Sequence, residues 1–150
     1  MKIFLGSDHG GFDWKKKVFA YLSKNGYDVE DVGAKQLDPE DDYPQFAKQA
    51  CLQVIGSEDD DPRAILLCRG GQGMAIAANR HRGIRASVVW NAHEAKMTRV
   101  DNDSNVLCIP SDHIEEGELF GIIETWLSTE FSAAPRHIRR LQEIDDFYPG

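Results

Sequence analysis

An apolar run that leads straight into a cluster of glycines constrains the fold of this chain more than any other feature. Residues 64–67 are all apolar and are typical of a buried strand. Three glycines, Gly70, Gly71 and Gly73, follow within four positions, and residues 74–79 are rich in alanine and other good helix formers. The stretch therefore predicts a strand, a tight turn and a helix in immediate succession.

This turn has the features of a site that binds an anion and transfers a proton. Glycines let the backbone come close to a ligand, and the first N–H groups of a helix attract phosphates and other anions. Cys68 stands where the strand ends, and we expect the helix N-terminus and Arg69 to lower the pKa of its thiol. An ordinary strand-to-helix turn with a buried cysteine explains the same spacing equally well. The pattern is neither a dinucleotide-binding fingerprint nor a P-loop, because no Gly-Lys-Ser/Thr follows.

Length and composition favour an ordinary globular protein. The chain has 150 residues, enough for one domain over residues 1–150 with its own core. Its 17 basic and 25 acidic residues give a formal net charge of −8, which argues against nucleic acid as a partner. No apolar run is long enough to cross a membrane, and the N-terminus turns polar too early for a signal peptide. The three cysteines lack metal-binding spacing, so we expect reduced thiols, a cytoplasmic protein and no bound metal.

Predicted strands and helices alternate along the whole chain. Strands are expected at residues 2–6, 27–32, 64–67, 84–90 and 105–109, with helices between them and a last helix at about 135–144. We also expect Trp14 to be buried in the first helix, and Ser111 or Asp112 to cap the helix after the fifth strand. The alternation predicts a three-layer α/β fold, with about five parallel strands and helices on both faces. Because ligands of such sheets bind beyond the carboxyl ends of the strands, the polar turns there should meet at one edge.

Two further groups of polar residues are candidates for a site. Asp8 and His9 follow the first strand directly; Asp8 is either a helix cap or, with His9, part of the ligand crevice. Arg136 and Arg140 are four residues apart and share one helix face. In an acidic chain such a pair suggests a phosphate clamp, because arginine binds phosphate through two donors, although a solvated basic face gives the same pattern.

Six motifs occur together and in order, at residues 6–12, 42–44, 68–79, 83–86, 102–107 and 136–140. With these motifs the chain resembles, over nearly its whole length, the ribose-5-phosphate isomerase B family, which includes the galactose-6-phosphate isomerase subunits. The resemblance implies a Rossmann-like fold and the interconversion of aldose and ketose phosphates without a metal or organic cofactor. It also implies a phosphorylated sugar as substrate and a homodimer with active sites between the subunits, while pairing of dimers into tetramers stays open.

The resemblance implies roles for individual residues as well. Cys68 matches the base that moves a proton between C1 and C2 of the sugar through a cis-enediolate, and Arg69 to Gly73 match the loop that holds this intermediate. The chemistry suits these residues, because proton abstraction beside a carbonyl needs a base and N–H donors for the developing oxyanion. The remaining matches are Asp8 and His9 at the sugar ring and phosphate, Asn102 as a substrate contact, and Arg136 and Arg140 as phosphate ligands.

Three positions of the expected site depart from the family pattern. Arg69-Gly70-Gly71 stands where Gly-Thr-Gly is common, Asp101 replaces the ring-opening histidine, and Asp112 replaces a phosphate-contacting arginine. An aspartate, with a reference pKa of about 3.9, is a poor proton donor at neutral pH unless it is buried. Taking Cys68, Asp8 and Asp101 as the candidate catalytic residues, we hypothesise that the enzyme prefers an open-chain substrate such as a tetrose 4-phosphate.

Two other interpretations remain open at this point. A buried Asp101 with a raised pKa would still act as the ring-opening acid, and pentose or hexose phosphates would then be substrates. A non-catalytic protein that binds or senses sugar phosphates on the same scaffold is the alternative to an isomerase.

Overall fold

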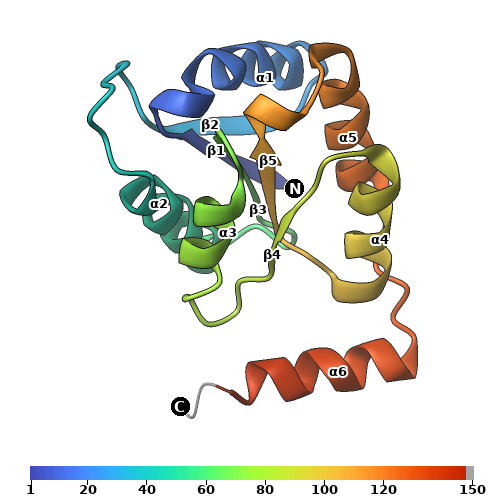
Figure 1. Ribbon diagram of the computed structural model, residues 1–150. Helices are drawn as coiled ribbons and strands as arrows, with labels where there is room; N and C mark the ends of the chain where they lie inside the picture. Colours follow the sequence, from blue (N-terminus) through green and yellow to red (C-terminus); the bar gives the residue numbers. More distant parts are fainter. Residues whose placement is uncertain (148–150) are drawn as a thin grey trace.

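The computed structural model describes residues 1–147, which contain one five-stranded sheet with all strands parallel (Figure 1). The strand order is β2-β1-β3-β5-β4. The strands are β1 (Lys2–Ser7), β2 (Asp28–Gly33), β3 (Arg63–Cys68), β4 (Ala86–Val88) and β5 (Val106–Pro110). The predicted α/β class with five parallel strands is therefore confirmed.

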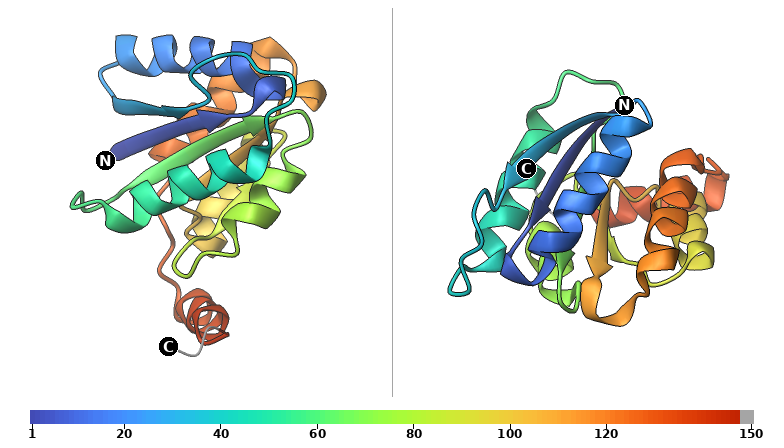
Figure 2. Two further views of the ribbon diagram at one scale, coloured as in Figure 1. Left: turned by 90° about the vertical axis from the view of Figure 1, so that its left-hand side faces the viewer. Right: turned by 90° about the horizontal axis from the view of Figure 1, so that it is seen from above.

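Helices cover both faces of this sheet and make it the middle of three layers (Figure 2). One face carries α1 (Phe12–Lys24), α4 (Ala92–Asn102) and α5 (Glu116–Ser128). The other face carries α2 (Tyr43–Gly56) and the short α3 (Gln72–Ala78). Each strand-to-helix-to-strand connection returns the chain to the same end of the sheet, which is why the strands are parallel.

The central strand β3 is buried along its whole length, because it has a strand on each side and helices on each face. This explains why its sequence is continuously apolar rather than alternating. Ile65 and Leu67 pack with α1, α4 and α5, whereas Leu66 and Cys68 pack with α2 and α3. The thiol of Cys68 thus faces the side of the sheet that α3 covers.

The strand order reverses between β1 and β3, since the chain moves outward from β1 to β2 and then crosses back to β3. At such a switch point, the loops that leave the two neighbouring strands turn to opposite faces and open a crevice at their carboxyl ends. Asp8 follows β1 and Cys68 ends β3. The topology therefore places the two predicted turns on the two sides of this crevice.

The last helix, α6 (Pro135–Asp145), stands apart from the three layers, beyond the edge formed by β4 (Figures 1 and 2). Its contacts with the rest of the described chain are mainly with α4. Ile138, Ile144 and, just after the helix, Phe147 are exposed apolar side chains on this segment. Leu141 is buried against the rest of the chain, so α6 covers only part of its apolar surface within one chain.

Several local predictions need correction. The fourth strand is short, Ala86–Val88, rather than residues 84–90. Residues Ser111–His113 form a 3-10 turn, so the cap of α5 is Glu115 and neither Ser111 nor Asp112. In α1 the buried residues are Phe12, Lys15, Val18 and Leu22, while Trp14 is only half-buried. The ammonium group of Lys15 lies 2.8 Å from Asp31 Oδ1. A buried, ion-paired lysine, rather than the neighbouring Trp14, thus completes the inward face of α1.

Within residues 1–147, none of the helices is both long enough and apolar enough to cross a lipid bilayer.

Candidate active site

The turns after β1 and β3 are in direct contact, and glycines make this contact possible. A Cβ atom on Gly11 would lie 2.5 Å from the carbonyl oxygen of Leu67, closer than real contacts allow. A Cβ atom on Gly10 would lie 2.5 Å from Cγ of Arg69. The stem of Arg69 therefore runs across the turn that carries Asp8 and His9, which agrees with the prediction that the polar turns meet at one edge of the sheet.

Asp8 is held by the backbone of its own turn. Its Oδ1 accepts hydrogen bonds from the N–H groups of Gly10 at 2.9 Å and Gly11 at 3.3 Å, which makes it the N-cap of the 3-10 helix η1 (His9–Gly11). The side chain is nevertheless buried, and this burial raises the pKa of the Asp8 carboxyl above its ordinary value. Asp8 therefore caps a turn, as one of the two interpretations predicts, while its role at a ligand stays a prediction.

His9 has an acidic partner that the sequence alone did not single out. Nδ1 of His9 lies 2.7 Å from Oδ1 of Asp41, a residue of the acidic loop between β2 and α2. This hydrogen bond raises the pKa of the His9 imidazole above its ordinary value. One possible ligand atom from each of Asp8, His9 and Asp41 lies within 4.8 Å of the others. His9 Nδ1 and Asp41 Oδ1 bond each other, and Asp8 Oδ1 accepts backbone N–H groups. We therefore describe the three as a hydrogen-bonded cluster.

Cys68 lies at the carboxyl end of β3 with its sulfur turned towards the glycine loop. The N–H group of Gly71 donates a hydrogen bond to Sγ at 3.1 Å. Burial is the larger influence and raises the pKa of the thiol above 9.0, although the N–H groups of Gly71, Met74 and Gly70 act to lower it. The sequence predicts a lowered pKa for the Cys68 thiol. Within a single chain that prediction is wrong, because only 6% of Cys68 is exposed.

The glycine loop takes a shape that other residues would resist. Gly71 is the N-cap of α3 and has a φ of 70°, in the left-handed region that favours glycine. A Cβ atom on Gly73 would lie 2.5 Å from Cζ of Tyr43, so the tyrosine ring at the start of α2 packs against this loop. Tyr43 is a second residue of the site that sequence reasoning did not assign to it. The loop thus presents backbone N–H groups next to the thiol, as an anion-binding turn requires.

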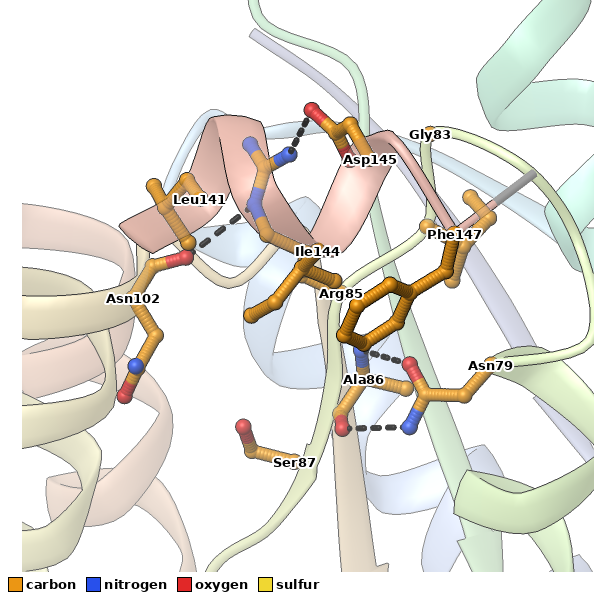
Figure 3. Close-up of a pocket in the computed structure, with 11 residues that line it drawn as sticks. Asn79, Gly83, Arg85, Ala86, Ser87, Asn102, Leu141, Ile144, Asp145 and Phe147 are labelled. Atoms are coloured by element: carbon orange, nitrogen blue, oxygen red, sulfur yellow. Dashed lines mark hydrogen bonds and ion pairs between the residues drawn. The ribbon is translucent and has the colours of Figure 1, made fainter. Parts of the chain in front are cut away.

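Asp101 and Asn102 lie at the other end of the sheet. Both residues end α4, just before β5 begins at Val106. Cys68 pairs with Pro110, which is at the other end of β5. Four residues of strand span roughly 13 Å. Asn102 lines a hollow of about 310 Å³ beneath α6, where its carbonyl oxygen accepts a hydrogen bond from Nε of Arg85 at 3.0 Å (Figure 3).

The basic motif on α6 is also separate from Cys68 within one chain. Arg136 and Arg140 are exposed on the helix that stands beyond the β4 edge (Figure 1). His137, between them, is buried, and its Nε2 lies 3.6 Å from Oδ1 of Asp101. The structure therefore divides the predicted site residues into two groups, one at the β1–β3 switch point and one on α4 and α6.

A smaller hollow adjoins the glycine loop on its outer side. Its volume is about 270 Å³, and its lining is Gly70, Gln72, Val88, Trp90, Pro110 and His113. Trp90 is 51% exposed. An open, largely apolar surface thus lies beside the loop that we assign to the reacting end of a substrate.

The geometry predicts how the cysteines react with an alkylating agent such as iodoacetamide. Only the thiolate reacts. Because burial raises the pKa of Cys51 to about 12 and leaves it fully covered, Cys68 should be alkylated first. Since the pKa of Cys68 is also raised, its reaction rate should keep increasing with pH beyond 9.0. Mass spectrometry of peptides from timed reactions measures both, and alkylation of Cys51 as fast as Cys68 would contradict the assignment.

Comparison with known proteins places this arrangement in a family. The family model described as Ribose/Galactose Isomerase matches residues 3–144. The ribose-5-phosphate isomerase B of Escherichia coli (strain K12) is 37% identical over 143 residues, covering 95% of this chain and 93% of the relative.

Solved structures agree with the sequence comparison. Ribose 5-phosphate isomerase B from Thermotoga maritima aligns with a TM-score of 0.91 and 41% identity, covering 97% of both chains. The enzyme from Mycoplasma genitalium, solved with bound ribulose 5-phosphate, aligns with a TM-score of 0.92 and 33% identity, covering 97% of this chain and 95% of that one. Fold, sequence and family model all agree, and the chain belongs to the ribose/galactose isomerase family.

Proposed function

We propose that this protein is an aldose–ketose isomerase of phosphorylated sugars, with Cys68 as the base. The observation that carries the proposal is the contact between the Cys68 sulfur and the Gly71 N–H, 3.1 Å apart, at the switch point of the sheet. Family membership over residues 3–144 supports it. Screening four-, five- and six-carbon aldose and ketose phosphates for isomerisation tests it, and no turnover of any of them would contradict it.

In the proposed reaction, the Cys68 thiolate removes the proton from C2 of the open-chain aldose phosphate. The electrons form a cis-enediolate, whose negative oxygen lies against the backbone N–H groups of the glycine loop. The thiol then returns the proton to C1, while a second proton moves from O2 to O1. Asp8 is our candidate for this second transfer, because a buried carboxyl with a raised pKa exchanges protons more readily near neutral pH.

We further propose that the complete site forms between two copies of the chain. Arg136 and Arg140 are too far from Cys68 in one chain to reach a common ligand, because α6 stands beyond the β4 edge. The exposed apolar side chains of Ile138 and Ile144 give α6 a surface suited to a second subunit. In such a dimer the arginines of one copy would hold the phosphate while Cys68 of the other copy moves the proton.

The exposure of the Asp101 side chain is relevant to which sugar phosphate the enzyme isomerises. Its side chain is 40% exposed and its Oδ1 lies 3.6 Å from His137 Nε2, so within one chain Asp101 is not the buried acid of the alternative interpretation. A tetrose 4-phosphate needs no ring-opening acid, because its O4 carries the phosphate and cannot close a furanose ring. We therefore keep a tetrose 4-phosphate as the leading substrate and assign Asp101 to orienting a hydroxyl.

Two substitutions at Asp101 test this substrate assignment. Asp101→Asn should change kcat/KM for erythrose 4-phosphate little, because the amide keeps an oxygen that can accept a hydrogen bond from a substrate hydroxyl. Asp101→His should introduce or increase turnover of ribose 5-phosphate by supplying a proton donor that titrates near neutral pH. Steady-state kinetics with both sugars measures this. Efficient turnover of ribose 5-phosphate by the wild type, lost in Asp101→Asn, would show that Asp101 is itself the ring-opening acid.

A further inference from the structure

Asp41 makes two hydrogen bonds to a single residue of a neighbouring loop. Its Oδ1 accepts the backbone N–H of His9 at 3.1 Å and lies 2.7 Å from the imidazole Nδ1. The two residues are 32 positions apart and follow strands β1 and β2, which lie side by side in the sheet. Asp41 therefore fixes both the main chain and the ring of His9.

The carboxylate of Asp41 depends on His9 for charge compensation. Its side chain is only 5% exposed, and within the described chain His9 is its one ion-pair partner. The second oxygen, Oδ2, is buried and has no hydrogen-bond partner among residues 1–147. A buried carboxylate without a donor or a counter-charge is costly. Folding of this loop therefore favours His9 in its positively charged form.

The other charged groups near His9 do not reverse this balance. Asp8, on the same turn, also favours the charged imidazole, whereas Arg69, whose stem crosses Gly10, opposes it. The hydrogen bond to Asp41 is the largest influence, and the pKa of His9 is raised overall. Two carboxylates, Asp8 and Asp41, thus favour the charged His9 ring, and one guanidinium, Arg69, opposes it.

The same contact determines which ring nitrogen is available to a ligand. Nδ1 is occupied by Asp41, while the His9 side chain remains 27% exposed. In the charged ring both nitrogens carry a proton, so Nε2–H remains as a donor for an anion. We propose that Asp41 is a positioning residue, which keeps His9 charged and leaves Nε2–H directed to the phosphate of the bound sugar. This inference rests on the proposed function for the identity of the ligand.

The first test measures His9 itself and needs no activity. With isotope-labelled histidine, NMR titration of the wild type should give a His9 pKa above the ordinary 6.5. Asp41→Asn keeps the shape of the side chain but removes its charge, so the His9 pKa should fall. Glu40→Gln is the matched control, because it removes the same charge from an exposed position of the same loop and should leave His9 unchanged.

The second test uses sulfate as a probe of the anion site, since sulfate keeps its charge over the range in which histidine titrates. Sulfate should shift the His9 signals in the wild type, and its binding should weaken as pH rises through the His9 pKa. In Asp41→Asn the same weakening should occur at lower pH. At a pH where only the wild-type ring is charged, KM for the sugar phosphate should rise roughly tenfold in Asp41→Asn, with kcat nearly unchanged.

Three results would overturn the proposal. The first is a wild-type His9 pKa at or below 6.5, which needs no variant and so does not depend on whether Asp41→Asn folds. The second is the same His9 pKa in the wild type and in Asp41→Asn. The third is a loss of kcat with unchanged KM, which would place Asp41 in the chemical step instead. If no sugar phosphate is isomerised but His9 responds to Asp41→Asn and to sulfate as expected, the proposed function fails while the positioning role stands.

Discussion

Cys68→Ser should lower kcat by roughly 10²–10⁴-fold, the usual contribution of a positioned acid or base. A serine hydroxyl is a far weaker base than a thiolate, so it cannot take the proton from C2. The fold should be kept, because a serine Oγ can also accept the hydrogen bond from the Gly71 N–H that now reaches the sulfur at 3.1 Å. Steady-state kinetics on the best substrate of the screen measures the effect.

The control for this experiment is Cys51→Ala. Cys51 is a buried thiol of α2 with a pKa raised by burial to about 12, so its removal should leave proton transfer intact. Inhibition by inorganic phosphate should be similar in the wild type and in Cys68→Ser, because the phosphate is assigned to other residues. Activity of Cys68→Ser within a few fold of the wild type would mean that another group is the base.

Arg136→Ala and Arg140→Ala should each raise KM for the sugar phosphate by roughly 10- to 150-fold. This is the fold-change that corresponds to losing a charge-assisted contact of about 1.5–3 kcal/mol. Arg139→Ala removes the same charge from the same helix and should have a much smaller effect. Equal effects at all three positions would show that only the overall positive charge of α6 matters.

The division of the site between subunits can be tested by mixing two inactive variants. In a dimer of Cys68→Ser with the double variant Arg136→Ala/Arg140→Ala, one of the two sites receives both the native thiol and the native arginines. If subunits exchange freely in an equal mixture, half of the dimers are mixed, so about one quarter of all sites should be active. No recovery after verified subunit exchange would contradict a shared site, because each subunit would then need its own cysteine and arginines.

Structural features that are determined by residues close together in the sequence were predictable. The continuous apolar run of β3 and the glycines that follow it indicate a buried strand and a tight turn, and both are present. Asp8 was predicted as a cap or as a site residue, and its bonds to Gly10 and Gly11 show the cap directly. Local propensity and turn chemistry carry this information.

Features that depend on tertiary packing were not predictable. The loop at residues 38–42 holds several acidic residues, and only the pairing of β1 with β2 brings Asp41, among them, onto His9. The Cys68 pKa was predicted from the helix terminus and Arg69, whereas the structure shows that burial by packing against α2 and α3 is the larger influence. The separation of Asp101 from Cys68 is different, because the predicted parallel alternation already puts the end of α4 at the opposite edge of the sheet from the end of β3.

Hydrogen exchange between substrate and solvent tests the central claim most directly. The protein is incubated in heavy water with erythrose 4-phosphate, ribose 5-phosphate or galactose 6-phosphate, and deuterium at C1 and C2 is measured by NMR. An isomerase that works through an enediolate should place deuterium at one of these carbons in at least one sugar, even when net turnover is slow. Cys68→Ser should place none. A wild-type protein that binds these phosphates without any exchange would contradict the account and identify a binding protein instead.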